Sequence, residues 1–251
     1  MKPLSTPVML VWLSVAAMAQ TRPSLPPPGG SIPGPEGNPM SARREGPAGP
    51  VPRMVDGKPD LSGVWFSPRT VDPGKPAMLP WAAALTKERT ENHSKGDPES
   101  QCLPAGVPRM NPFPWKILQT PNLLVMLFEG NIHTYRQIFF NREHPKDLDP
   151  TWYGDSIGKW DGDTLVIDTI GFNDKFWFDF QGHPHTEQLH VTERFHRRDY
   201  GNLDMDITIE DPGAYTEPWR IKRTSPLMVK GEIQEYICNE NNQDVEHIVG
   251  K

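Results

Sequence analysis

The stretch LDMDITIE at 203–210 alternates apolar and polar side chains without a break. Leu203, Met205, Ile207 and Ile209 fall on one side of an extended chain, and acidic or hydroxyl side chains fall on the other. This period of two is typical of a β-strand with one face against a core and one face in water. The chain therefore needs a sheet whose inner face is apolar.

Further strand-like segments follow one another along the chain. The sequence predicts strands in LSGVWF (61–66), LLVMLFEGN, HTYRQIFFN, SIGKWDGDTLVIDTIGF, LHVTERFHRRD, PWRIKRTS and GEIQEYICNE. Turns at Gly130-Asn131, Asp161-Gly162 and Tyr200-Gly201-Asn202 predict three hairpins. The last two segments are expected to form a final pair. WAAALTKERTENH at 81–93 is the one convincing helical stretch, because it is rich in Ala, Leu, Lys and Glu.

About eight consecutive antiparallel strands with little helix predict an all-β domain. We expect an antiparallel up-and-down barrel, similar to lipocalins and other calycins, with one short helix. A barrel of this size holds one small ligand. A two-sheet β-sandwich is the alternative that the same pattern leaves open.

The N-terminal residues predict a cleaved signal peptide over 1–19. Lys2 precedes an apolar run of about 12 residues, and Ala17-Met18-Ala19 provides a cleavage site. The run is too short to span a bilayer, which needs about 20 residues. We therefore expect an exported protein, periplasmic or extracellular, without a membrane span. Residues 20–58 are predicted to be a disordered Pro/Gly-rich linker, and residues 59–251 a single barrel domain.

The two cysteines, Cys102 and Cys238, fit an oxidising compartment. An even count there predicts one disulfide, and two buried free thiols are the alternative. Their wide separation without a CxxC motif argues against a zinc knuckle. The formal charge of −6, and the absence of a basic patch other than the local pair Arg197-Arg198, argue against nucleic acid as a partner.

Four of the chain's eight histidines lie in GHPHTEQLHVTERFHRR at 182–198. Here His185, Glu187 and His190 combine two imidazoles with a carboxylate. Histidine titrates near physiological pH and a neighbouring carboxylate fixes its tautomer, so this set suits acid–base chemistry. The same donors suit Zn, Fe, Mn or Cu, but the spacing is not an established metal motif. We predict no cofactor; any divalent metal would use these three residues. A structural hydrogen-bond cluster is the third interpretation.

The strand that follows should present two different faces. His196 and Arg198 are expected on a solvated face. Glu193 falls on the apolar face, where a carboxylate must be paired. Arg136, on a strand earlier in the chain, is the predicted partner in a structural ion pair, although a functional acid inside the barrel remains open.

GFNDKFWFDFQG at 171–182 crowds aromatic rings into one connection. It is either a lid over the barrel mouth that lines a pocket for an aromatic or apolar ligand, or a plug of core that closes the barrel end. The predicted substrate contacts are Trp152, Asp155, Phe172, Asn173, Trp177 and Arg194.

Several segments together resemble a family of exported bacterial β-rich proteins that is abundant in soil bacteria. They are CLPAGVPR, PTWYGDSIGKWDGDTLVIDTIGFND, GHPHTEQLHVTERF, TIEDPGAYTEPW and EYICNENN. The resemblance covers about residues 60–245. It implies a single secreted β-rich domain and carries over no activity. GKWDGDTLVID also has a distant likeness to strands of lipocalin-like barrels, which rests on fold analogy alone.

The sequence thus predicts an exported barrel enzyme that acts on a small aromatic or apolar organic substrate, as a lyase, isomerase or hydrolase. His185 would be the base, Glu187 its orienting carboxylate, and His190 a second acid or ligand contact. The alternatives are a non-catalytic protein that binds a small molecule and a cell-envelope assembly component. A barrel interior filled with side chains would argue against both the enzyme and the binding protein, and would favour the assembly role. The sequence gives no indication of oligomeric state.

Overall fold

A computed structural model of the protein describes residues 45–109, 113–130, 134–238 and 240. The signal peptide predicted over 1–19 and the predicted linker as far as residue 44 lie outside these residues.

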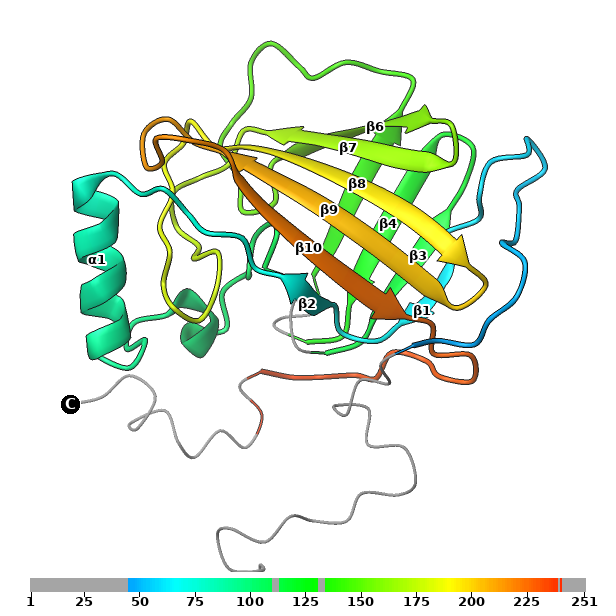
Figure 1. Ribbon diagram of the computed structural model, residues 1–251, viewed down its shortest axis with the longest axis horizontal. Helices are drawn as coiled ribbons and strands as arrows, with labels where there is room; N and C mark the ends of the chain where they lie inside the picture. Colours follow the sequence, from blue (N-terminus) through cyan, green and yellow to red (C-terminus); the bar gives the residue numbers. More distant parts are fainter. Residues whose placement is uncertain (1–44, 110–112, 131–133, 239, 241–251) are drawn as a thin grey trace, which may run out of the picture. The chain divides into compact units, whose positions relative to one another are not determined.

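The predicted all-β, barrel-like architecture is confirmed (Figure 1). One curled sheet contains ten strands, in the order β1-β3-β4-β5-β6-β7-β8-β9-β10-β2, where about eight were expected. The strands are β1 (Gly63–Trp65), β2 (Arg69–Asp72), β3 (Trp115–Gln119), β4 (Leu123–Phe128), β5 (Tyr135–Phe140), β6 (Asp155–Asp161), β7 (Thr164–Ile170), β8 (His190–Asp199), β9 (Asn202–Glu210) and β10 (Trp219–Pro226). The described residues add one α-helix, α1 (Pro80–Glu91), and a 3₁₀ turn, η1 (Pro98–Gln101).

The three predicted hairpins are confirmed as β4–β5, β6–β7 and β8–β9. The predicted pairing of PWRIKRTS with GEIQEYICNE is wrong. The second edge of β10 is occupied by β2, so residues 231–238 have no strand to join. They run past the sheet instead, where Lys116 Nζ lies 2.6 Å from Glu232 Oε2 and the Gln234 main-chain N–H donates to Glu129 Oε2 at 2.8 Å.

One neighbouring pair departs from the up-and-down pattern. β5 and β6 run parallel, with Ile138 opposite Ser156. Parallel neighbours need a crossover of a dozen or more residues. Residues 141–154 provide that crossover, which carries the chain back past the outside of the barrel.

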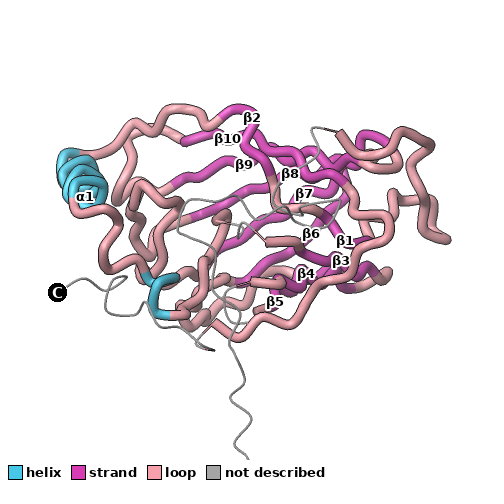
Figure 2. The backbone as a smooth tube through the Cα atoms, turned by 90° about the horizontal axis from the view of Figure 1, so that it is seen from below, coloured by secondary structure: helices cyan, strands magenta, loops and turns pink. Residues whose placement is uncertain are grey.

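The segment 63–72 joins the two edges of the sheet. Its first part, β1, pairs with β3 and also meets the end of β10, where Phe66 N donates to Pro226 O and Met228 N to Val64 O, both at 2.8 Å. Its second part, β2, pairs with β10. Because one segment pairs with both edges, the sheet is curled, with β2 and β10 on one side and β5 on the other (Figure 2). The helix α1 lies beyond one end of the strands.

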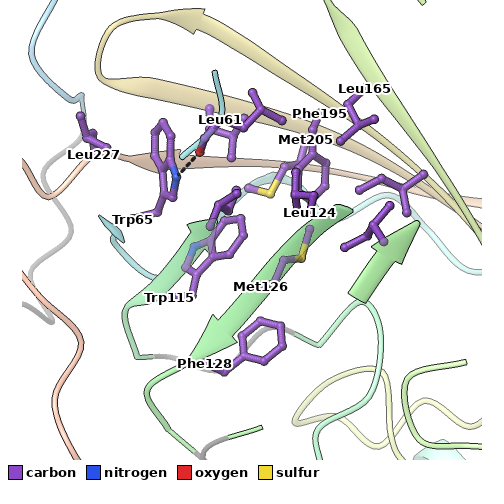
Figure 3. Packing of buried hydrophobic residues seen from close by; sticks show 14 residues of the cluster. Leu61, Trp65, Trp115, Leu124, Met126, Phe128, Leu165, Phe195, Met205 and Leu227 are labelled. Atoms are coloured by element: carbon purple, nitrogen blue, oxygen red, sulfur yellow. Dashed lines mark hydrogen bonds between the residues drawn. The ribbon is translucent and has the colours of Figure 1, made fainter. Parts of the chain in front are cut away.

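Two apolar clusters fill the curled sheet. One contains Trp115 of β3 and Phe195 of β8, whose rings meet edge to face at 6.2 Å (Figure 3). The other lies toward α1 and contains residues of the 171–182 connection together with Val191, Ile209 and Trp219. Facing strands therefore pack on each other's side chains in the interior.

Two predicted pairings of side chains are present. Arg136 Nη1 lies 2.6 Å from Glu193 Oε2, and both side chains are buried. Cys102 and Cys238 form a disulfide with Cα atoms 5.8 Å apart. The disulfide fastens the C-terminal segment to the residue that follows η1.

Residues 45–58 lie against the barrel end where β8 turns into β9. The Gly46 main-chain N–H donates to Asn202 Oδ1 at 2.7 Å, and Tyr200 N donates to Gly49 O at 2.9 Å. This part of the predicted linker is thus hydrogen-bonded to the domain. The helices found among the described residues fall short of the length and apolar character that a membrane crossing requires.

Candidate functional site

The loop with His185 lies between α1 and one end of the barrel. Arg89 Nη1 of α1 donates to Gly182 O at 2.8 Å, and Tyr215 Oη donates to Pro184 O at 2.7 Å. Thr186 is held from the other side, since its Oγ1 donates to Asp211 Oδ1 at 2.7 Å. In Figure 1 this loop passes beside α1. Contacts from α1 and from the connection between β9 and β10 therefore fix the backbone on both sides of His185.

The His185 imidazole is almost completely buried, with 4% of the residue exposed. Its ring centroid lies 3.9 Å from that of Phe176 and 5.0 Å from that of Phe178. Burial among these rings lowers the pKa of His185, because removal from water disfavours the charged imidazolium. The ring is therefore neutral at neutral pH.

The tautomer of His185 follows from its hydrogen bonds. Nδ1 lies 3.2 Å from the Thr186 carbonyl oxygen, which can only accept, so Nδ1 carries the proton. Nε2 is buried and makes no hydrogen bond among the described residues. The Phe176 main-chain carbonyl lies close to the ring and partly offsets the effect of burial on the pKa of His185. Nε2 is consequently an unprotonated nitrogen with an unused lone pair.

A cavity of about 300 Å³ is bounded by this loop and by α1. Its wall combines apolar and charged side chains: Trp81, Leu85, Arg89, Asp174, Phe176, Pro184, His185, Thr186 and Glu187. Trp81 is 44% exposed, and its indole N–H donates to Gly213 O at 2.9 Å, which fixes the ring. One guanidinium and two carboxylates thus surround a small space beside a neutral imidazole.

The structure brings together two of the three predicted catalytic residues. His185 and Glu187 both line the cavity, but Glu187 is exposed, and the Thr186 carbonyl, rather than a carboxylate, orients the imidazole. His190 is the first residue of β8 and lies outside this wall. Its Nε2 is hydrogen-bonded to Asp168 of β7.

His190 belongs to a chain of side chains on the outer face of the sheet. Asp168 also contacts His144 Nε2 at 3.2 Å, and His144 Nδ1 lies 2.7 Å from Asp155 Oδ1. Burial opposes ionisation of Asp168, but hydrogen bonds from the two imidazoles outweigh it and lower the pKa of that carboxyl. This chain fastens the 141–154 crossover to β6, β7 and β8.

The sequence analysis missed His144. The residue stands in NREHPKD, far in sequence from Asp168 and without an alternating pattern around it. Only the parallel pairing of β5 with β6 brings the crossover, and with it His144, over the start of β6.

The six predicted substrate contacts do not gather around one cavity. Asp155 bonds to His144, and Arg194 Nη2 to Asp161 Oδ2 at 2.7 Å on the outer face. Trp152 lines a separate cavity beside Tyr135. The remaining three, which are Phe172, Asn173 and Trp177, are buried in the 171–182 connection.

The 171–182 connection packs as a plug. Phe172, Phe176 and Phe178 are each at most 1% exposed and belong to the apolar cluster near α1. Trp177 lies under the Arg89 guanidinium, 4.2 Å from ring centroid to Cζ. Of the two alternatives for this segment, these contacts fit core that closes the barrel end.

The described residues contain no group of three or more His, Cys, Asp or Glu side chains arranged to hold a metal ion.

No family model matches the chain, and neither a curated protein nor a solved structure matches it. Fold and side chains together define a barrel-like all-β protein with a disulfide and a buried, neutral imidazole in the wall of a cavity at one barrel end.

Proposed function

We propose that the protein is an exported enzyme that transfers a proton on a small organic substrate, with His185 as the general base. The observation that carries the proposal is the state of His185, a residue of the cavity wall: the ring is neutral, Nδ1 is protonated on the Thr186 carbonyl, and the buried Nε2 makes no hydrogen bond among the described residues. A base needs an available lone pair at the working pH, and this arrangement supplies one.

The other wall residues have separate roles in the proposed reaction. Trp81 and Leu85 of α1 provide apolar surface for an aromatic or aliphatic part of the substrate. Arg89 supplies positive charge for an oxyanion or enolate that forms as the proton leaves. Glu187, at the exposed rim, is placed to return a proton or to hold a polar group. These roles suit a lyase, an isomerase or a hydrolase.

Access to Nε2 requires a small rearrangement, because that atom is buried in this structure. Asp174 and Glu187 are the exposed charged residues of the wall, so they are the parts that we expect a substrate to displace, while Trp81, also exposed, is fixed by its hydrogen bond to Gly213. Catalytic hydrogen bonds often form only once the substrate is bound.

The packed interior of the barrel helps to choose among an enzyme, a binding protein and an assembly component. Side chains fill the curled sheet, which counts against a substrate or ligand held inside the barrel, as the sequence predicted, and supports the assembly role as the alternative. The acid–base proposal therefore rests on the cavity between α1 and the His185 loop, in place of the hollow interior that the sequence predicted. Export is supported by the Cys102–Cys238 disulfide, since such bonds persist in oxidising compartments.

The test is a screen of small aromatic esters, glycosides and activated carbon acids with the purified protein, His185→Gln, Glu187→Gln and the control His196→Gln. His196 is exposed on the outer face of β8, away from the cavity. Loss of the base should reduce turnover by about 10²–10⁴-fold in His185→Gln, while His196→Gln keeps full activity. Equal turnover in the two histidine variants would defeat the assignment, and binding without turnover would favour a binding protein.

A further inference from the structure

A second cavity, of about 500 Å³, lies at the barrel end opposite α1. It is bounded by the turn between β3 and β4, by the ends of β5 and β6, and by residues 56–58. This end also holds the turn between β6 and β7, and the blue segment that contains residues 45–60 runs past it in Figure 1. None of the residues of the His185 cavity contributes to this one.

The base of this cavity is aromatic. Phe140 of β5 and Trp160 of β6 are partly buried and pack on the inner apolar cluster, and both line the cavity. Gly158 lies opposite Phe140 in the parallel register, and a Cβ there would stand 2.6 Å from Phe140 Cε1. The missing side chain lets the Phe140 ring lie across β6.

The rim of the cavity carries three cations and two carboxylates, although the whole chain has a formal charge of −6. Lys58 Nζ lies 5.9 Å from the centroid of the Trp160 ring. Lys159 is exposed. Arg142 stacks over Phe139 with 4.0 Å from Cζ to ring centroid and forms an ion pair with Asp155, which neutralises its charge. Asp56 is already engaged, because its Oδ1 accepts the Lys58 main-chain N–H at 3.0 Å.

The wall formed by residues 53–58 is anchored to the sheet. Arg53 makes two hydrogen bonds to Asp163, at 2.9 and 2.7 Å, and a third to Gly57 O at 2.9 Å. Lys58 Nζ reaches Gly162 O at 3.5 Å. The segment therefore holds Lys58 over the aromatic base.

We propose that this cavity binds a small aromatic carboxylate. The flat rings of Phe140 and Trp160 offer a surface for a planar ring, and aromatic pairs gain from contact beyond the area they bury. Lys58 and Lys159 supply the positive charge that meets the carboxylate. The mouth of a barrel is a common place for such a pocket. This inference is independent of the proposed acid–base function.

The test compares benzoate with benzamide, its uncharged analogue of nearly the same shape. Isothermal titration should give a dissociation constant for benzoate at least about 5-fold lower than for benzamide, and added salt should weaken benzoate binding because exposed charges are screened. In the ¹H–¹⁵N spectrum, benzoate should shift the indole N–H of Trp160 in particular.

Two charge-reversal variants locate the site. Lys159→Glu should weaken benzoate binding by at least about 5-fold, since it places a negative charge at the rim. Lys95→Glu, an exposed lysine just beyond α1, should leave binding unchanged. The proposal is overturned by no detectable benzoate binding at 20 mM, by equal binding of benzamide, or by equal effects of the two substitutions.

Discussion

Arg136 of β5 and Glu193 of β8 meet at 2.6 Å inside the barrel, although β6 and β7 lie between their strands. The guanidinium reaches across the concave face and donates to Ser156 Oγ of β6 at 3.0 Å and Thr169 Oγ1 of β7 at 2.7 Å. One residue from each of four consecutive strands thus forms a polar layer, which links the curled sheet across its interior.

Removal of either charge from this layer should destabilise the fold, because the remaining partner is left buried and unpaired. The expected loss is about 3–5 kcal/mol for a broken buried pair. Glu193→Gln should cost more than Arg136→Met, since Arg223 of β10 is also attracted to Glu193 and would lose that partner. Urea unfolding of both variants measures the difference.

The double variant Arg136→Met/Glu193→Leu is the control for this prediction. It removes both charges, so it should recover much of the stability lost in Glu193→Gln. Single variants that each unfold within about 1 kcal/mol of the parent would show that the pair is hydrated in solution.

The interior pair was accessible from the sequence because alternation placed Glu193 among apolar neighbours. The same reasoning identified the hairpins. It missed β2, whose four residues are all exposed and show no alternation, and β3, which is short and follows a Pro-rich stretch. A strand was also predicted in GEIQEYICNE (231–240), but the edge of β10 that it needed is covered by β2.

The candidate site was only partly predictable. A loop with Gly182 and Pro184 brought His185 and Glu187 to one cavity. His190 faces outward, because β8 begins there and its side chain shares the outer face with Thr192 and Arg194. The role of the Thr186 carbonyl depends on backbone geometry, which residue spacing does not encode.

The lowered pKa of His185 predicts that acid destabilises the protein. The folded state holds the imidazole neutral, whereas the unfolded chain protonates it below a pH of about 6.5. Its contribution to stability is therefore complete above that pH and is lost as the pH falls from there toward the lowered folded value. The midpoints of urea unfolding, measured at pH 7.5, 6.5 and 5.5, report this loss of stability.

The matched variants separate His185 from the other titrating groups. His185→Gln should show a smaller drop in midpoint between pH 7.5 and 5.5 than the parent, and His196→Gln should behave like the parent. If all three proteins lose the same stability over this range, His185 is not the titrating group.

The Cys102–Cys238 disulfide spans 136 residues, so its removal should have a large effect on the unfolded chain. Loop-closure entropy sets an upper value of about 4–5 kcal/mol for a loop of that length. We expect the Cys102→Ser/Cys238→Ser variant to fold but to unfold at lower urea. The parent protein with reductant should unfold at the same urea concentration as this variant. If the urea midpoint of the variant equals that of the oxidised parent, residual order in the unfolded chain cancels the entropic effect of the disulfide.

Gly106 supports the wall of the His185 cavity through Phe176. It has a φ of +71°, and a Cβ at this position would stand 2.2 Å from Phe176 Cγ. Phe176 in turn packs on His185 with ring centroids 3.9 Å apart. Gly106→Ala therefore combines backbone strain with a collision that must move the Phe176 ring, and with it the imidazole.

Gly57→Ala is the control, since Gly57 has a φ of +82° and nothing within 4 Å of an added Cβ. Backbone strain alone should cost about 1–2 kcal/mol there. Gly106→Ala should lose about 1–3 kcal/mol more, the usual cost of overpacking a rigid core. It should also shift the ring resonances of His185, which Gly57→Ala leaves in place. Equal melting temperatures for the two variants would mean that the 171–182 connection rearranges around Phe176 at little cost. A cavity wall that rearranges so easily could not hold the His185 base in position.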